Sequence, residues 1–140
     1  MFKKFFKKKQ EIQNNERVLI ISLLIHAARI DENYTDSEKN IISKAIVDLY
    51  KIKPEEADKL IELAEQKEGE SNQIIEFTRE IKKYTMKFRL KIIEIIWKIV
   101  YSDGTNDNYE SNLIRRICGL LYISDKDSGI IKNKIKNMIK

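Results

Sequence analysis

The chain has little of what cross-links or interrupts a fold. Its 140 residues include one cysteine, one proline and four glycines. A lone cysteine leaves no partner for an intramolecular disulfide and favours a reducing compartment, and the scarcity of glycine and proline argues against a second domain. No uninterrupted apolar run is long enough to cross a membrane, and the first residues lack the apolar stretch of a secretory signal. We expect one domain, located in the cytoplasm.

The alternation of apolar and polar residues that marks a β-strand is also missing. Apolar residues instead recur every three to four positions, as they do in α-helices. The sequence predicts an all-α fold, a compact single-domain bundle of about seven helices. The expected helices cover residues 10–30, 36–50 and 54–68, followed by four that start after the caps Ser71, Thr85, Asp107 and Ser124.

Residues suited to nucleophilic catalysis are sparse. His26 is the single histidine and lies in the most apolar of the expected helices, so we expect a core residue with a backbone partner. Cys118 follows an apolar helical pattern with no base assigned to it, which predicts a buried, inert thiol. We therefore expect no enzymatic activity.

The basic excess is confined to the start of the chain. The net charge is +5, and residues 1–9 hold five lysines and no acid, so the remaining 22 basic and 22 acidic residues balance. A nucleic-acid groove needs Lys and Arg on one folded face, so we expect no nucleic-acid partner. We divide the chain into a basic, aromatic arm (residues 1–9) and a helical domain (residues 10–140).

The arm interleaves aromatic and basic side chains. The residues concerned are Phe2, Lys3, Lys4, Phe5, Phe6, Lys7, Lys8 and Lys9. Two interpretations stay open: an anionic membrane surface with Phe inserted and Lys at the phosphates, or a disordered, solubilising tail.

The most informative feature of the chain is an internal sequence repeat. At one constant offset, Asp31 aligns with Asp103. The first corner (residues 31–38) and the second corner (residues 103–110) each run from an Asp to a Glu. Flanking apolar positions match at the same offset: Ile20, Ile21, Leu23, Leu24, Ala27 and Ala28 fall on Ile92, Ile93, Ile95, Ile96, Ile99 and Val100. A repeated helix–corner–helix unit predicts a pseudo-twofold bundle in which the two corners come together.

Six carboxylates mark these corners: Asp31, Asp36, Glu38, Asp103, Asp107 and Glu110. They allow two interpretations. Glu38 and Glu110 stand three residues after the potential N-caps Thr35 and Asp107, where a carboxylate completes a capping box. Asp31 and Asp103, however, follow the carboxyl ends of helices, where the helix dipole disfavours negative charge. The alternative is a ligand, either a basic partner or a divalent cation, and these oxygen donors suit Ca²⁺, Mg²⁺ or Mn²⁺ rather than Zn²⁺.

The second corner and its flanks resemble a known family. Residues 97–104 (WKIVYSDG), then Tyr109 and Glu110, then residues 113–117 (LIRRI) resemble the TerB-like tellurite-resistance family (TerB domain). Its pattern is an apolar helix ending in an Asp-Gly corner, followed by a Glu that opens a helix carrying Ile-Arg-Arg. The first corner departs from it, with Asp31 followed by Glu32 instead of Gly. The resemblance covers roughly residues 15–128.

The resemblance implies a helical domain with no established enzymatic activity. It also implies a negative patch proposed to bind metal ions, with candidate positions Asp31, Glu38, Asp103 and Glu110. The expected role is in the cytoplasm, partly at the inner membrane, with the proteins of a tellurite-resistance or related stress-response complex. The alternative is a purely structural protein–protein interaction module without a metal site.

Overall fold

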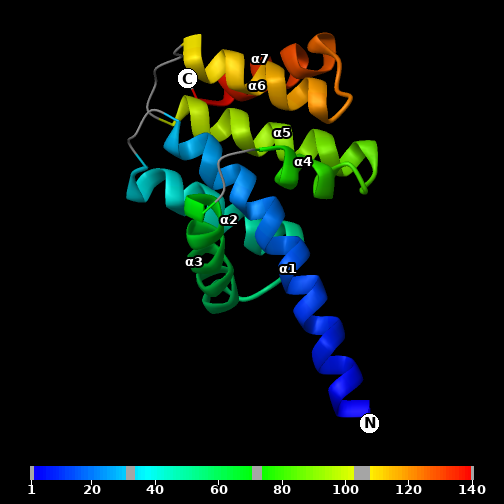
Figure 1. Cartoon of the computed structure of the whole chain (residues 1–140). Helices are drawn as coiled ribbons and strands as arrows, with labels where there is room; N and C mark the ends of the chain where they lie inside the picture. Colours follow the sequence, from blue (N-terminus) through cyan, green and yellow to red (C-terminus); the bar gives the residue numbers. More distant parts are fainter. Residues whose placement is uncertain (1, 31–33, 71–73, 103–107, 140) are drawn as a thin grey trace.

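The fold is an all-α bundle, seen here in a computed structural model that describes residues 2–30, 34–70, 74–102 and 108–139. Within those ranges the chain forms seven helices and no strand (Figure 1). They are α1 (Phe2–Arg29), α2 (Asp36–Tyr50), α3 (Pro54–Glu70), α4 (Ile75–Ile81), α5 (Met86–Tyr101), α6 (Asn108–Leu120) and α7 (Asp125–Ile139). The predicted all-α fold is confirmed.

Side-chain caps start several of these helices. Thr35 caps α2, its Oγ1 accepting from the Glu38 backbone N–H at 3.3 Å, and the capping box is complete. Thr85 accepts from the Phe88 N–H at 3.2 Å at the start of α5, and Ser124 accepts from the Asp127 N–H at 3.1 Å at the start of α7. These three predicted caps are confirmed, whereas Ser71 and Asp107 lie outside the described residues.

The second half of α1 is the centre of the core. It contacts α2, α3, α4 and α5, and its residues 20–25 are all buried. The six residues of α1 that the repeat pairs with α5, and their six counterparts, are all at most 4% exposed. The repeat therefore coincides with the core of the two helices, while the pseudo-twofold relation between the halves stays a prediction.

The first half of α1 differs from the expected arm. Residues 2–9 are not separate from the first helix but form its beginning, so α1 is one helix of 28 residues. Between Lys3 and Asn15 every residue whose side chain is described is exposed, and the first buried residue is Val18. Residues 2–15 are called the projecting segment here, because the amino end of α1 extends away from the rest of the bundle (Figure 1). Further along the segment, Gln10, Gln13 and Asn14 line a groove with α3.

Candidate functional site

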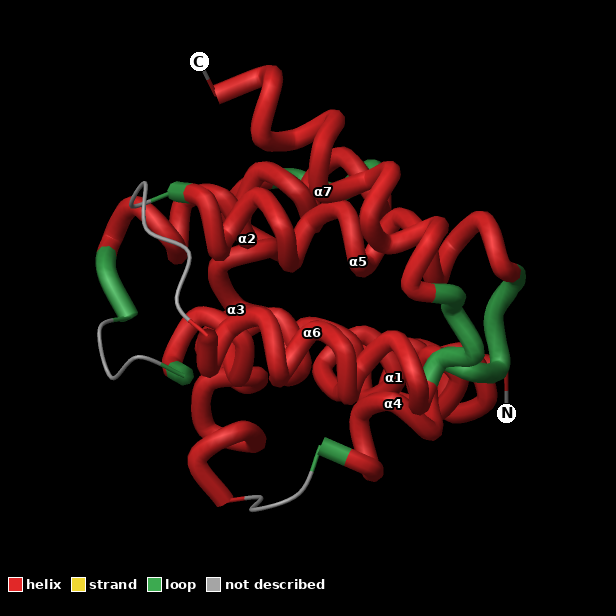
Figure 2. The backbone as a smooth tube through the Cα atoms, turned by 90° about the horizontal axis from the view of Figure 1, so that it is seen from above, coloured by secondary structure: helices red, strands yellow, loops and turns green. Residues whose placement is uncertain are grey.

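The described flanks of the two corners lie on one side of the molecule. The carboxyl ends of α1 and α5 and the amino ends of α2 and α6 are all on the left in two perpendicular views (Figures 1 and 2). Two of these helices, α2 and α5, contact each other, and Ser37 and Ile41 of α2 line one groove with Tyr101 of α5 and with Ser102, the C-cap of α5. The helices that enter and leave the corners are thus neighbours.

The six candidate carboxylates are only partly described. Asp31, Asp103 and Asp107 lie outside the described residues, and Glu110 belongs to α6 but its side chain is not among those described. Asp36 is exposed at the first position of α2. Glu38, one turn further, is only 8% exposed.

Glu38 is engaged within its own turn. Its Oε1 accepts hydrogen bonds from the backbone N–H and the Oγ1 of Thr35, both at 3.1 Å. These bonds satisfy a helix N-terminus that would otherwise leave its first N–H groups without partners. The capping interpretation therefore holds for Glu38, and any ligand would have to share this carboxylate with Thr35.

The described part of the chain contains no group of three or more His, Cys, Asp or Glu side chains placed to hold a metal ion. The acids of the corners that the structure describes, Asp36 and Glu38, both belong to the first turn of α2. A shared ion would need carboxylates from both corners.

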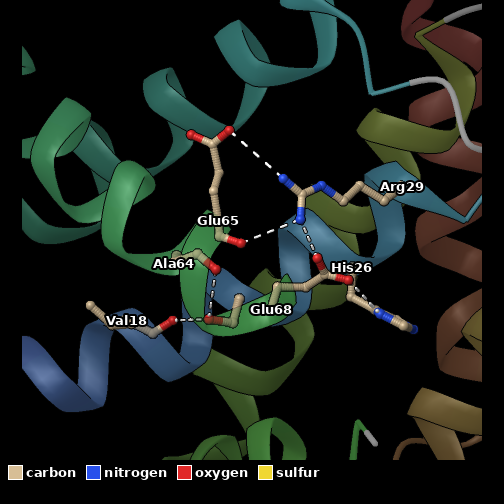
Figure 3. A network of polar contacts seen from close by, with 7 residues as sticks. Val18, His26, Arg29, Ala64, Glu65 and Glu68 are labelled. Atoms are coloured by element: carbon tan, nitrogen blue, oxygen red, sulfur yellow. Dashed lines mark hydrogen bonds and ion pairs between the residues drawn. The ribbon is translucent and has the colours of Figure 1, made fainter. Parts of the chain in front are cut away.

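A polar network stands beside the first corner and was not anticipated from the sequence (Figure 3). Arg29, the last residue of α1, pairs with Glu68 of α3 and also donates to the backbone carbonyl of Glu65 at 3.3 Å. Glu65 pairs with Lys39 of α2 at 3.2 Å. His26 Nδ1 lies 3.1 Å from Glu68 Oε1. The network joins α1, α2 and α3 at the entrance to the corner.

Tyr34 contacts the network on the side of the first corner. The guanidinium of Arg29 lies over its ring, 5.2 Å from the centroid, a favourable cation–π geometry. Burial, reinforced by the charge of Glu65, raises the pKa of Tyr34 to about 12. The Tyr34 hydroxyl is buried and has no hydrogen-bond partner among the described residues. This phenol stays neutral at physiological pH.

Two expectations about single residues had different outcomes. Cys118 is buried, as predicted, and its burial raises the pKa of the thiol, which disfavours the reactive thiolate. The expectation for His26 was wrong: its side chain is 27% exposed and its partner is the carboxylate of Glu68 rather than a backbone group.

The fold and this corner define a compact all-helical domain with polar groups gathered where its helices turn. Residues 17–133 match the family described as tellurite resistance protein TerB, and the chain belongs to this family. No curated protein and no solved structure matches the chain. Family membership thus rests on the sequence pattern across most of the chain.

Proposed function

We propose that the chain is a non-enzymatic binding protein of a tellurite-resistance or related stress response. It associates with the anionic surface of the inner membrane through the projecting segment of α1 and binds a divalent cation or a basic partner at its two corners. The observation that carries the proposal is that the projecting segment is a continuous helix in which every side chain that the structure describes is exposed.

The helical register sorts the projecting segment into two faces. With 3.6 residues per turn, Phe2, Phe5, Phe6 and Ile12 fall on one face, while Lys3, Lys4, Lys7 and Lys8 fall on the opposite face. Lys9 interrupts the apolar face, where its aliphatic stem can lie along the surface with the ammonium group turned to the phosphates. Ile12 is 52% exposed, although it is apolar. An amphipathic helix of this kind suits the surface of a bilayer.

The expected binding is reversible. Each lysine near an anionic surface contributes about 1 kcal/mol, so five lysines contribute on the order of 5 kcal/mol, equivalent to roughly submillimolar affinity. Inserted phenylalanines add to this term. None of the described helices is long and apolar enough to cross a membrane.

Vesicle co-sedimentation tests the membrane proposal. The full chain should pellet with vesicles containing phosphatidylglycerol and stay in solution with pure phosphatidylcholine. Substituting Lys3, Lys4, Lys7 and Lys8 by Gln should abolish pelleting, and added salt should weaken it. The matched control replaces four exposed lysines of the body, Lys53, Lys87, Lys91 and Lys126, by Gln. If both quadruple variants pellet alike, charge on the projecting segment is not the cause and the proposal fails.

The cation proposal is supported by the shared side of the two corners. The ends of α1 and α5 and the start of α2 lie on that side of the molecule, and α5 contacts both α1 and α2, so Asp31 and Asp103 follow helix ends on the same side. Asp36 adds an exposed carboxylate at the same helix start. Acids at the carboxyl ends of two helices oppose the local dipole, and a bound cation would offset that cost.

Calorimetric titration with Ca²⁺, Mg²⁺ and Mn²⁺ tests the corners. Binding heat should appear for the natural chain and vanish in Asp31→Asn/Asp103→Asn, whereas Asp58→Asn/Glu62→Gln on the exposed face of α3 should leave it unchanged. Absence of heat for the natural chain refutes the cation and favours the interaction module. Heat that persists in the Asp31→Asn/Asp103→Asn variant refutes the corners as its site.

A further inference from the structure

The most basic and the most acidic segments of the chain lie in two helices that contact each other, α1 and α3. Residues 2–9 of α1 hold five lysines and no acid, whereas α3 holds seven acids against two lysines. No other described helix has an excess of more than one acid. A positively charged helix that docks on this chain would therefore meet its strongest attraction at α3.

The first half of α3 presents its acids to solvent. Four of them are exposed and take part in no ion pair among the described residues: Glu55, Glu56, Asp58 and Glu62. The bases beside them are Lys53, Lys59 and Arg17, and the guanidinium of Arg17 lies over the ring of Tyr50, 4.5 Å from its centroid. Leu63 is 51% exposed in the same part of α3, and the aliphatic stems of docked lysines would cover it.

The lysines of the projecting segment extend past the α3 of their own chain. Gln10 lines a groove with the first turns of α3. Further along, Ser22 donates to the carbonyl of Ala64 at 3.4 Å and Arg29 pairs with Glu68, so the two helices run in the same direction. Residues 3–8 continue α1 beyond the level at which α3 begins (Figure 1).

These lysines nevertheless lie on the side of α1 that α3 occupies. With 3.6 residues per turn, about 18 residues make five turns, so Lys4 is in register with Ser22 and Lys8 with His26. Both Ser22 and His26 contact α3. A second α3, supplied by another molecule, would continue along the same side of α1 and meet the lysines.

We propose that the chain forms a symmetric dimer in which the lysines of each projecting segment dock on the first half of the other copy's α3. A two-fold axis that crosses α1 near Gln10 reverses the chain direction, so residues 3–8 of one copy lie level with residues 12–17 of the other. That stretch of α1 lines a groove with Glu56, Lys59 and Leu63, so the lysines reach the first half of α3. The contact forms twice and closes the pair.

The dimer and the membrane use the same lysines. Lysines docked on α3 are not available to lipid phosphates, so an anionic bilayer competes with the dimer. The acids of α3 take part in the dimer alone, and variants of α3 therefore separate this proposal from the membrane proposal.

Sedimentation velocity without lipid measures the oligomeric state. Over a concentration series at low ionic strength, the natural chain should reach twice the monomer mass of 16.6 kDa. The dimer should dissociate as salt is added, because salt screens exposed charges. A natural chain that stays monomeric at low salt overturns the proposal.

Two charge-reversed variants test the assigned surfaces. The first replaces the lysines of the projecting segment by Glu and the second replaces the acids of α3 by Lys, at positions Lys3, Lys4, Lys7 and Lys8, and at Glu55, Glu56, Asp58 and Glu62. Each variant alone should dimerise about tenfold more weakly or less, because like charges then face each other. An equimolar mixture should dimerise again, since both contacts of a mixed pair join opposite charges, and this would also show that both variants are folded. A mixture that stays monomeric overturns the exchange of segments.

A control variant separates these surfaces from net charge. Replacing Lys87, Lys91, Lys126 and Lys136 by Glu changes the net charge as much as the first variant does, at exposed positions on other helices. This control should dimerise as the natural chain does, and equal weakening would overturn the assigned surfaces. The α3 variant should still pellet with vesicles containing phosphatidylglycerol, so failure of the dimer leaves the membrane proposal standing.

Discussion

The guanidinium of Arg29 and the carboxylate of Glu68 form an ion pair that ties the last turn of α1 to the last turn of α3. Glu68 is only 11% exposed and contacts His26 as well. Water solvates such a carboxylate poorly, so its charge is balanced mainly by the guanidinium of Arg29. Because α1 leads into the first corner, the pair fixes the direction in which the chain enters it.

We expect Glu68→Gln to lower the free energy of unfolding by about 1–3 kcal/mol, since it removes a charge-assisted hydrogen bond to Arg29 and leaves that cation without its closest carboxylate. Urea unfolding at neutral pH measures the change. Glu62→Gln, on the exposed face of the same helix, is the matched control and should stay within about 0.5 kcal/mol of the natural chain. Equal stability of the two variants would show that the pair contributes nothing.

The capping box of α2 makes a second prediction. Thr35→Ala removes the acceptor of the Glu38 N–H and should cost about 1 kcal/mol. Glu38→Gln should cost clearly less, because glutamine also serves at the third position of a capping box. Chemical denaturation of both variants shows which of the two substitutions lowers the free energy of unfolding more. The opposite order would mean that the charge of Glu38, rather than its place in the box, stabilises the turn.

Tyr50 should make the folded state sensitive to alkaline pH. Burial, followed by nearby Tyr84, raises the pKa of its phenol above the ordinary value of 10.0. The folded state therefore favours the neutral phenol. The stabilisation is complete below pH 10.0 and is lost as pH rises beyond it, because the unfolded chain ionises first. Unfolding midpoints measured across that range should fall more steeply for the natural chain than for Tyr50→Phe. If the midpoints of the natural chain and of Tyr50→Phe fell equally steeply with pH, Tyr50 would not be the cause of the alkaline sensitivity.

The features that the sequence predicted correctly depend on neighbouring residues. The caps Thr35, Thr85 and Ser124 each bond to an N–H three residues on, so their signal is local. The start of α1 was placed too late because the interpretation relied on apolar periodicity. Residues 2–9 contain no glycine or proline, and five lysines favour a helix without such a pattern.

The contacts that were missed join residues far apart in the chain. His26 and Arg29 of α1 stand three residues apart, as do Glu65 and Glu68 of α3, and this matched spacing was the available signal. Predicting the contacts from this spacing would have required knowing that α1 lies against α3. Glu65 and Glu68 are therefore mostly buried, although an acid on a helix is usually exposed.

Tyr122 shows how far the repeat extends. Its counterpart in the repeat, Tyr50, is half-buried, whereas Tyr122 is 71% exposed and has a φ of 58°. The Ile123 N–H donates to the Cys118 carbonyl at 2.9 Å and the Tyr122 N–H to the Gly119 carbonyl at 3.4 Å. This is the Schellman arrangement, whose left-handed position usually holds glycine. In the first hairpin the left-handed residue is Lys51, which is not the counterpart of Tyr122 in the repeat.

These two left-handed positions give a final prediction. At an ordinary helical position alanine is more stable than glycine by about 1 kcal/mol, but a side chain at positive φ costs roughly 1–2 kcal/mol. We therefore expect Tyr122→Gly to be more stable than Tyr122→Ala, and Lys51→Gly to be more stable than Lys51→Ala. Comparing glycine with alanine cancels the loss of the Lys82 contact with the Tyr122 ring, 5.1 Å from its centroid, because both variants lose it.

Lys126 in the first turn of α7 is exposed and serves as the control. There Lys126→Ala should be the more stable variant, so the order of the two substitutions should reverse between this site and the two helix ends. Urea unfolding of the six single variants supplies the comparison. If alanine were also preferred at Tyr122, the turn between α6 and α7 would not need its left-handed residue. The Cys118 and Gly119 carbonyls would then find their partners in another way.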